Sequence, residues 1–121
     1  MNTALEIKVI EKFFTKAKHN RYAGFISSTK NRFKFIRELS HLKDLRWELF
    51  SGINSFDLSG VGSRSIYVIS EDPGYDGKTI TRDQIVLLTD SGYAFILVFG
   101  EAEQVYYEGE PPGNRYISEV T

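Results

Sequence analysis

Four basic or titratable side chains lie at helical spacing before the middle of the chain: Lys30, Lys34, Arg37 and His41. At 100° per residue they fall within an arc of about 60°, and the apolar residues of the same segment lie opposite them. Cations along one helix face can each reach a different phosphate or carboxylate oxygen. This basic stripe therefore predicts an anion-binding or partner-binding face, and a merely solvated helix face is the alternative.

The motifs for metal, cofactor or catalytic chemistry are incomplete. Glu38 and His41 have the i, i+3 spacing of a di-iron helix, but the second copy that such a site needs is missing. Residues 72–83 depart from a calcium loop at its third and last positions, and residues 60–65 precede a predicted strand instead of following one. The chain has no cysteine, and its serines lack a nucleophile-elbow motif. We expect no catalytic residues, no metal and no cofactor.

Charge is segregated along the 121-residue chain. Residues 1–50 carry eleven Lys/Arg and five Asp/Glu, whereas residues 51–121 carry four Lys/Arg and eleven Asp/Glu. Such a split favours an anionic partner, and the alternative is attraction between the two halves inside one fold. Six of the seven tyrosines follow residue 66, and tyrosine is enriched at protein interfaces.

These features predict a small binding or regulatory module that acts through protein contacts. The expected partner is an acidic protein, or a second copy that meets the first through complementary faces. A nucleic-acid-binding module that uses the basic stripe is the first alternative, and a small enzyme without a recognisable motif is the second. No apolar run approaches the ~20 residues of a membrane span, so we expect no membrane partner and a cytoplasmic location.

Two amphipathic helices are predicted near the N-terminus to position the basic residues. Thr3 and Glu6 have the spacing of a capping box at the start of a helix over residues 4–18. The lysines of this helix form a stripe that could extend the basic stripe: Lys8, Lys12 and Lys16. A second helix is expected over residues 30–42, with Arg32 on its apolar side, where a long side chain can snorkel. Residues 21–26 are expected to form a helical turn or two.

Strands dominate the second half of the sequence. The predicted strands cover residues 65–69, 93–99, 104–107 and 115–120, and the continuous apolarity of 93–99 indicates burial on both faces. Residues 82–91 favour a helix slightly over a strand, while residues 45–50 are an apolar patch expected to pack on the helices. The last strand presents a possible edge for pairing with a second copy. The predicted core contains Val9, Phe13, Phe35, Leu39, Ile66, Val68, Phe95, Leu97 and Val105.

Helices gathered before strands predict an α+β fold, with N-terminal helices packed on a mainly antiparallel C-terminal sheet in a single domain. Several short segments also carry a resemblance: Arg21-Tyr22, Phe25-Ile26, Lys30 to Ile36, Leu39, His41, Asp76-Gly77-Lys78 and Val105 to Gly109. Through them most of the chain resembles small uncharacterised bacterial proteins. The resemblance implies a bacterial origin and favours the helix at 82–91, but it implies no activity.

Overall fold

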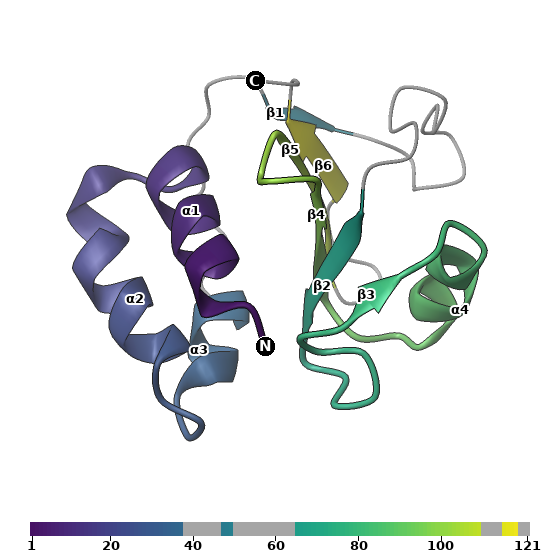
Figure 1. Ribbon diagram of the computed structural model, residues 1–121, viewed down its shortest axis with the longest axis horizontal. Helices are drawn as coiled ribbons and strands as arrows, with labels where there is room; N and C mark the ends of the chain where they lie inside the picture. Colours follow the sequence, from purple (N-terminus) through teal and green to yellow (C-terminus); the bar gives the residue numbers. More distant parts are fainter. Residues whose placement is uncertain (38–46, 50–64, 110–114, 119–121) are drawn as a thin grey trace.

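A six-stranded antiparallel sheet separates two sets of helices (Figure 1). The computed structural model describes residues 1–37, 47–49, 65–109 and 115–118. The helices are α1 (Thr3–Phe13), the 3-10 helix η1 (Lys16–Lys18), α2 (His19–Ile26), α3 (Arg32–Arg37) and α4 (Gln84–Asp90). The strands are β1 (Trp47–Leu49), β2 (Ile66–Ser70), β3 (Thr79–Ile80), β4 (Phe95–Phe99), β5 (Gln104–Glu108) and β6 (Arg115–Ser118). The predicted α+β class is confirmed.

The strand order β1-β6-β5-β4-β2-β3 corrects one expectation and adds a strand that we did not predict. Strand β6 lies between β5 and β1, so the C-terminal strand is not an edge open to a second copy. Its neighbour β1 comes from the apolar patch at 45–50, for which we predicted no strand; Trp47 pairs with Ser118 and Leu49 with Tyr116. The side chains of this patch, which we expected to pack on the helices, lie outside the described residues. A short apolar run has no periodicity that distinguishes a strand from a helical segment, and here pairing with β6 decides its conformation.

Helices cover both faces of the sheet, and within the predicted strand 93–99 the residues of β4 are buried as expected, whereas Tyr93 is exposed. Ile96 and Val98 belong to the core cluster under α1–α3, whereas Phe95, Leu97 and Phe99 belong to the cluster under α4. Successive side chains of a strand point to opposite faces, so a strand between two helical layers must be apolar at every position. All five residues of β4 are buried.

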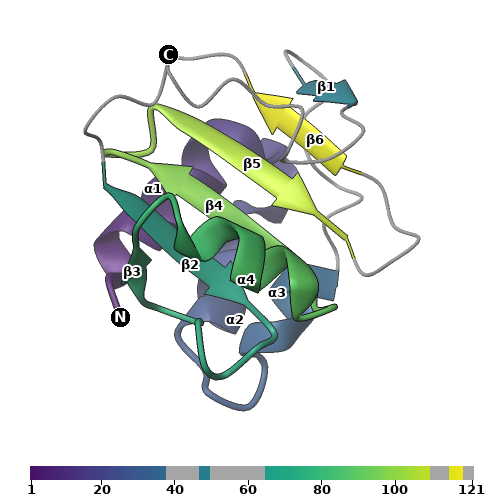
Figure 2. The same cartoon turned by 90° about the vertical axis from the view of Figure 1, so that its right-hand side faces the viewer.

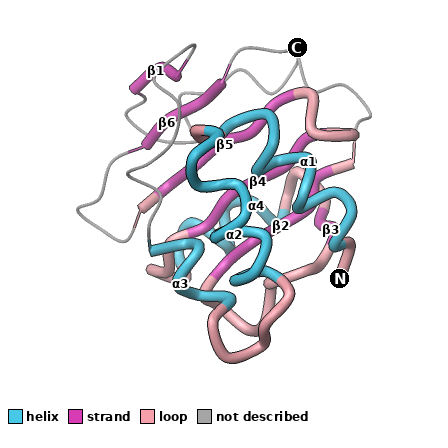
Figure 3. Tube along the Cα trace, turned by 90° about the vertical axis from the view of Figure 1, so that its left-hand side faces the viewer, coloured by secondary structure: helices cyan, strands magenta, loops and turns pink. Residues whose placement is uncertain are grey.

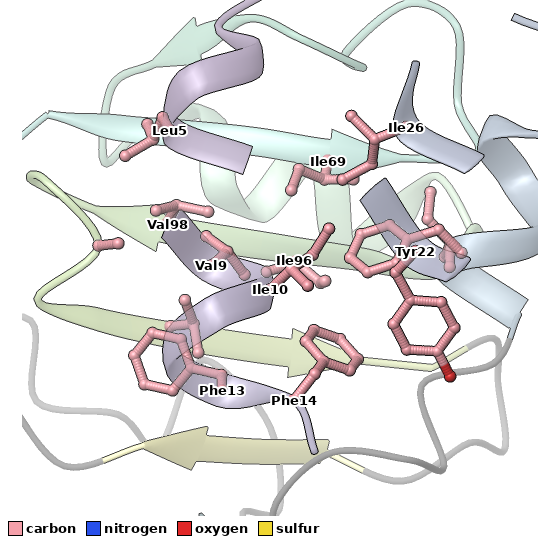
Figure 4. Close-up of a cluster of buried hydrophobic side chains, with 14 of the residues drawn as sticks. Leu5, Val9, Ile10, Phe13, Phe14, Tyr22, Ile26, Ile69, Ile96 and Val98 are labelled. Carbon is pink, nitrogen blue, oxygen red and sulfur yellow. The ribbon is translucent and has the colours of Figure 1, made fainter. Parts of the chain in front are cut away.

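The core between α1–α3 and the sheet is built from aliphatic and aromatic side chains. Figure 4 shows Val9 and Ile10 of α1 beside Ile96 and Val98 of β4. The first helix ends at Phe13, earlier than predicted, because the backbone at Phe14 is extended (φ −112°, ψ 155°). This bend lets α2 pack back along α1. Of the predicted core residues, Leu39 lies outside the described residues. The other eight are buried: Val9, Phe13, Phe35, Ile66, Val68, Phe95, Leu97 and Val105.

The favoured helix in residues 82–91 is confirmed as α4. The amide of Thr81 donates a hydrogen bond to Gln84 Oε1 at 2.9 Å, which is one half of a capping box. Ile85 and Leu88 are buried against the sheet. Gly92 has φ +81°, the left-handed conformation that commonly follows a helix C-terminus.

Two glycine-to-alanine substitutions should change stability in opposite directions. A Cβ would meet no atom within 4 Å at either Gly92 or Gly24. Gly92→Ala should destabilise the protein by about 1–2 kcal/mol. The added methyl group meets no other atom, so the loss is the cost of holding an alanine in the left-handed backbone conformation. Gly24 lies inside α2 with an ordinary backbone, so Gly24→Ala should stabilise by about 0.5–1 kcal/mol. Urea midpoints would check both, and two shifts of the same sign would contradict this account.

Candidate functional site

A buried network of charged side chains joins the helices to the sheet. Arg32 Nη1 and Nη2 donate hydrogen bonds to the two carboxylate oxygens of Glu6 at 2.6 and 2.7 Å. Arg32 Nε and Nη2 also donate to the two carboxylate oxygens of Asp76 at 2.6 and 2.9 Å. The Tyr67 hydroxyl donates to Glu6 Oε2 at 2.5 Å and accepts a hydrogen bond from the Asn2 amide at 3.0 Å. One guanidinium therefore holds two carboxylates.

Each member of this charged network comes from a different part of the fold. Glu6 lies on α1, Arg32 begins α3, Tyr67 lies on β2, and Asp76 lies in the loop between β2 and β3. The side chains of Glu6, Arg32 and Asp76 are only 0%, 5% and 6% exposed. Two carboxylates and one guanidinium carry a net charge of −1, and backbone amides help to offset it. The Ser70 amide, for example, donates to Asp76 Oδ1 at 3.1 Å.

The charged network shifts the proton affinities of two of its members. Burial alone lowers the pKa of Arg32, but the hydrogen bonds and charges of Glu6 and Asp76 outweigh burial and raise it, so the guanidinium stays protonated. Burial and the hydrogen bond to Glu6 raise the pKa of Tyr67 to about 12, against smaller opposing effects of the Asn2 amide and Arg32. The phenol therefore remains a hydrogen-bond donor well above neutral pH.

Tyr67→Phe should change how stability depends on alkaline pH. The pKa of Tyr67 is about 12 in the folded state and 10.0 for an ordinary tyrosine, so the unfolded chain loses its proton first as the pH rises. The contribution of Tyr67 is therefore complete below about pH 10 and is lost between about pH 10 and 12. At neutral pH the variant should be about 1.5–3 kcal/mol less stable, because a hydrogen bond to a charged group is lost.

Urea unfolding of the parent and Tyr67→Phe, compared at several pH values, would measure this difference. The gap in unfolding free energy should narrow steadily above pH 10. All other side chains are identical in the two proteins, so the comparison isolates Tyr67. A gap that stays constant through this pH range would contradict the raised pKa of Tyr67.

Sequence reasoning missed the charged network, although one signal was present. We interpreted Glu6 as part of a capping box with Thr3, but the helix is capped by Asn2, whose Oδ1 accepts from the Leu5 amide at 3.1 Å. Glu6 points into the protein instead. The signal was Arg32, a cation on the apolar side of its predicted helix; it is buried beside carboxylates and does not snorkel to solvent.

The predicted site residues occupy different environments. Lys30 is exposed in the turn before α3, so it lies outside the helix in which we placed it, and Lys34 is exposed on α3 itself. Arg37 is the last residue of α3, and only its backbone is described. His41 lies outside the described residues, as does the predicted helix beyond residue 37. Lys30 and Lys34 make no ion pair or side-chain hydrogen bond to another described residue.

The lysines of α1 do not simply extend this stripe. Lys8 Nζ lies 3.4 Å from Glu101 Oε2, and Lys12 Nζ donates to the carbonyl of Ala102 at 2.6 Å. Both contacts are with the turn between β4 and β5, whereas Lys30 and Lys34 lie around the start of α3. The basic residues of α1–α3 therefore spread over the whole helical layer, which faces the viewer in Figure 3.

The charge segregation of the sequence becomes a separation in space. Residues 1–37, which form the α1–α3 layer, carry nine Lys/Arg and two Asp/Glu, a net charge of +7. Residues 65–109, which form β2–β5 and α4, carry two Lys/Arg and eight Asp/Glu, a net charge of −6. Some of these charges meet inside the fold, as Arg32 meets Asp76. The exposed basic side chains of the α1–α3 layer, hereafter the basic layer, are Lys8, Lys12, Lys16, Arg21, Lys30 and Lys34.

The loop that resembles a calcium site is held by internal hydrogen bonds. Both carboxylate oxygens of Asp76 accept from Arg32, and Asp72 Oδ1 accepts from the Gly74 amide at 2.8 Å. No group of three His, Cys, Asp or Glu in the described segments could hold a metal ion.

Searches of family models, curated proteins and solved structures found no match to this chain. Across the segments with described coordinates, every helix is too short or too polar to cross a membrane.

Proposed function

We propose that the protein is a non-enzymatic binding module that acts through protein contacts and docks an acidic protein on its basic layer. The observation that carries this proposal is the net charge of +7 on one helical layer. Six of the basic side chains in that layer are exposed, and Lys16, Lys30 and Lys34 make no side-chain contact with a described residue of opposite charge. Such a surface attracts and orients an anionic partner.

The charged network supports this proposal because it fixes the backbone that presents two of the lysines. Lys30 and Lys34 lie two residues before and after Arg32, which is held by four hydrogen bonds to Glu6 and Asp76. A binding residue on an ordered backbone loses less conformational entropy when its partner binds. The buried arginine thus acts as an anchor between two exposed cations.

Exposed acidic residues among the lysines favour a protein over a nucleic acid. Glu101 pairs with Lys8, and Glu11 is exposed on α1 beside Lys12. A continuous phosphate backbone would be repelled by these carboxylates, whereas a protein surface of mixed charge can complement them. Nucleic acid binding through the same lysines remains the alternative function.

Fluorescence anisotropy with labelled probes would separate these functions. The probes are a glutamate-rich peptide that also carries interspersed lysines, a DNA duplex and a DNA single strand, each titrated over a series of salt concentrations. We expect the peptide to bind and Lys30→Glu/Lys34→Glu to weaken that binding at least about fivefold, because two attractions become two repulsions. The matched control is Lys78→Glu/Arg82→Glu, which makes the same change of charge outside the basic layer.

The titrations with DNA test the alternative function, nucleic acid binding. Three or four phosphate contacts would produce a slope of roughly −2 to −4 in log K against log salt, with little dependence on base sequence. DNA binding of this kind, lost in Lys30→Glu/Lys34→Glu, would replace our proposal with the nucleic-acid function. If none of the three probes distinguishes the parent from this variant, the basic layer is only solvated and the proposal is wrong.

A further inference from the structure

Two large exposed apolar side chains lie on α4, on the side of the sheet opposite the basic layer, and a third follows this helix in the chain. Among the described residues, the large apolar side chains that are exposed are Met1, Val86, Leu87 and Tyr93. Val86 and Leu87 are 51% and 58% exposed on α4, and Tyr93 is 45% exposed just after this helix. Figure 2 shows α4 standing in front of the sheet, with α1–α3 behind it. Exposed apolar patches of this kind mark contact surfaces.

Two acidic side chains share this outer face of α4. Asp83, Val86, Leu87 and Asp90 fall within an arc of about 100° at helical spacing, opposite the buried side chains of the helix. Asp83 is at the N-cap position but its side chain caps no backbone amide. Asp90 is in the last turn, where the helix dipole disfavours a negative charge. The helix dipole favours Asp83 at the N-terminus of α4 but not Asp90, so helix formation leaves Asp90 unexplained. We call Asp83, Val86, Leu87, Asp90 and Tyr93 the α4 patch.

The α4 patch fits neither of two self-contacts among the described faces, with a second α4 patch or with the basic layer of a second copy. Pairing of two α4 patches would place like charges opposite each other, which is unfavourable. The basic layer of a second copy would supply cations, but among the described residues of that layer only Met1 is a large exposed apolar side chain. That layer would leave Val86, Leu87 and Tyr93 without apolar contacts.

A surface that carries both cations and apolar side chains would complement the α4 patch. We propose that the α4 patch binds a basic amphipathic helix of a different protein. The apolar stripe of that helix would cover Val86, Leu87 and Tyr93, while its flanking lysines or arginines would pair with Asp83 and Asp90. Apolar burial supplies affinity in such contacts, and the charged rim sets orientation and partner choice. The module would then hold an acidic partner and a basic partner on opposite faces of one sheet.

A synthetic helix of leucine and lysine, with its leucines at i, i+3 and i+4 spacing, is a suitable probe. Its control is a scrambled peptide of the same composition, which keeps the charge but has no apolar stripe. We expect the amphipathic peptide to shift the amide NMR signals of residues 82–93 and to bind at least about tenfold more tightly than the scrambled one. Equal affinity for the two peptides, or signal shifts confined to other residues, would overturn the proposal.

Paired variants locate the binding face. Val86→Gln/Leu87→Gln should weaken peptide binding about tenfold or more, and glutamine keeps a good helix former at both exposed positions. Lys30→Gln/Lys34→Gln, on the opposite face, should leave peptide affinity within about twofold of the parent. If the first pair disturbs folding, as circular dichroism would show, Asp83→Asn/Asp90→Asn should weaken binding instead. Unchanged affinity in the α4 variants would contradict the proposed site.

Sedimentation of the protein alone tests the self-contact. We expect the protein to be a monomer at all concentrations. If it self-associates and the association disappears in Val86→Gln/Leu87→Gln, then a second copy occupies the α4 patch and the proposal is overturned. The losses expected from the α4 variants do not require any partner to bind at Lys30 and Lys34. The α4 proposal and the proposed function of the basic layer can therefore fail separately.

Discussion

Arg32→Met should destabilise the protein by about 3–5 kcal/mol, because it removes the only cation between two buried carboxylates in the described network. Methionine can fill much of the space of the arginine stem, so the loss is mainly electrostatic. Glu6 and Asp76, with side chains 0% and 6% exposed, would lose their buried countercharge and keep only neutral hydrogen-bond donors such as Tyr67 and the Ser70 amide. Urea unfolding of the purified variant at neutral pH would measure the loss.

Two comparisons make the Arg32 prediction specific. Lys34→Met removes an exposed cation from the same helix and should change stability by no more than about 0.5 kcal/mol. Glu6→Gln should make Arg32→Met less damaging than it is in the parent, since one of the two orphaned carboxylates is then absent. If the losses caused by Arg32→Met and Glu6→Gln simply add, or if Arg32→Met alone costs less than about 1 kcal/mol, the charged network does not join the α1–α3 helices to the sheet.

Phe35→Ala is the second substitution with a large expected effect, a loss of about 3–5 kcal/mol. The Phe35 ring is fully buried, and its centroid lies 5.2 Å from that of Phe14 and 5.5 Å from that of Tyr22. These rings come from α3, from the end of α1 and from α2, so the cavity would open where the three helices meet. Edge-on aromatic pairs add stabilisation beyond the buried area.

Phe33→Ala is the matched control for this cavity. Phe33 lies on the same helix but is only partly buried, so its truncation should cost clearly less than that of Phe35. Thermal unfolding of both variants would rank them. Equal losses would show that the ring cluster of Phe14, Tyr22 and Phe35 has no special part in holding α1–α3 together.

The parts of the fold that were predictable are those set by local pattern. Strand β4 is apolar at every position, and this alone predicted burial on both of its faces. Phe35 was predicted in the core from helical periodicity, and residues 82–91 favoured the helix that the structure shows as α4. In each case the pattern needs no knowledge of a distant partner.

The parts that failed depend on pairing between distant segments. Trp47 forms a strand because β6, about seventy residues later, offers an edge to pair with. Glu6 points inward because Arg32 and Tyr67 meet it there, and the sequence separations of 26 and 61 residues leave no local pattern. The basic stripe is a mixed case, since Lys34 is exposed on a helix as predicted while Lys30 lies in the turn before it.

Affinity capture from a nuclease-treated lysate of the native host tests the central claim most directly, that the basic layer docks an acidic protein. The baits are the tagged parent, Lys30→Glu/Lys34→Glu and the matched control Lys78→Glu/Arg82→Glu. Our account predicts one acidic protein in stoichiometric amount with the parent and the control, and its loss with Lys30→Glu/Lys34→Glu. Capture of that protein by all three baits, or of no acidic protein by the parent, would contradict the account.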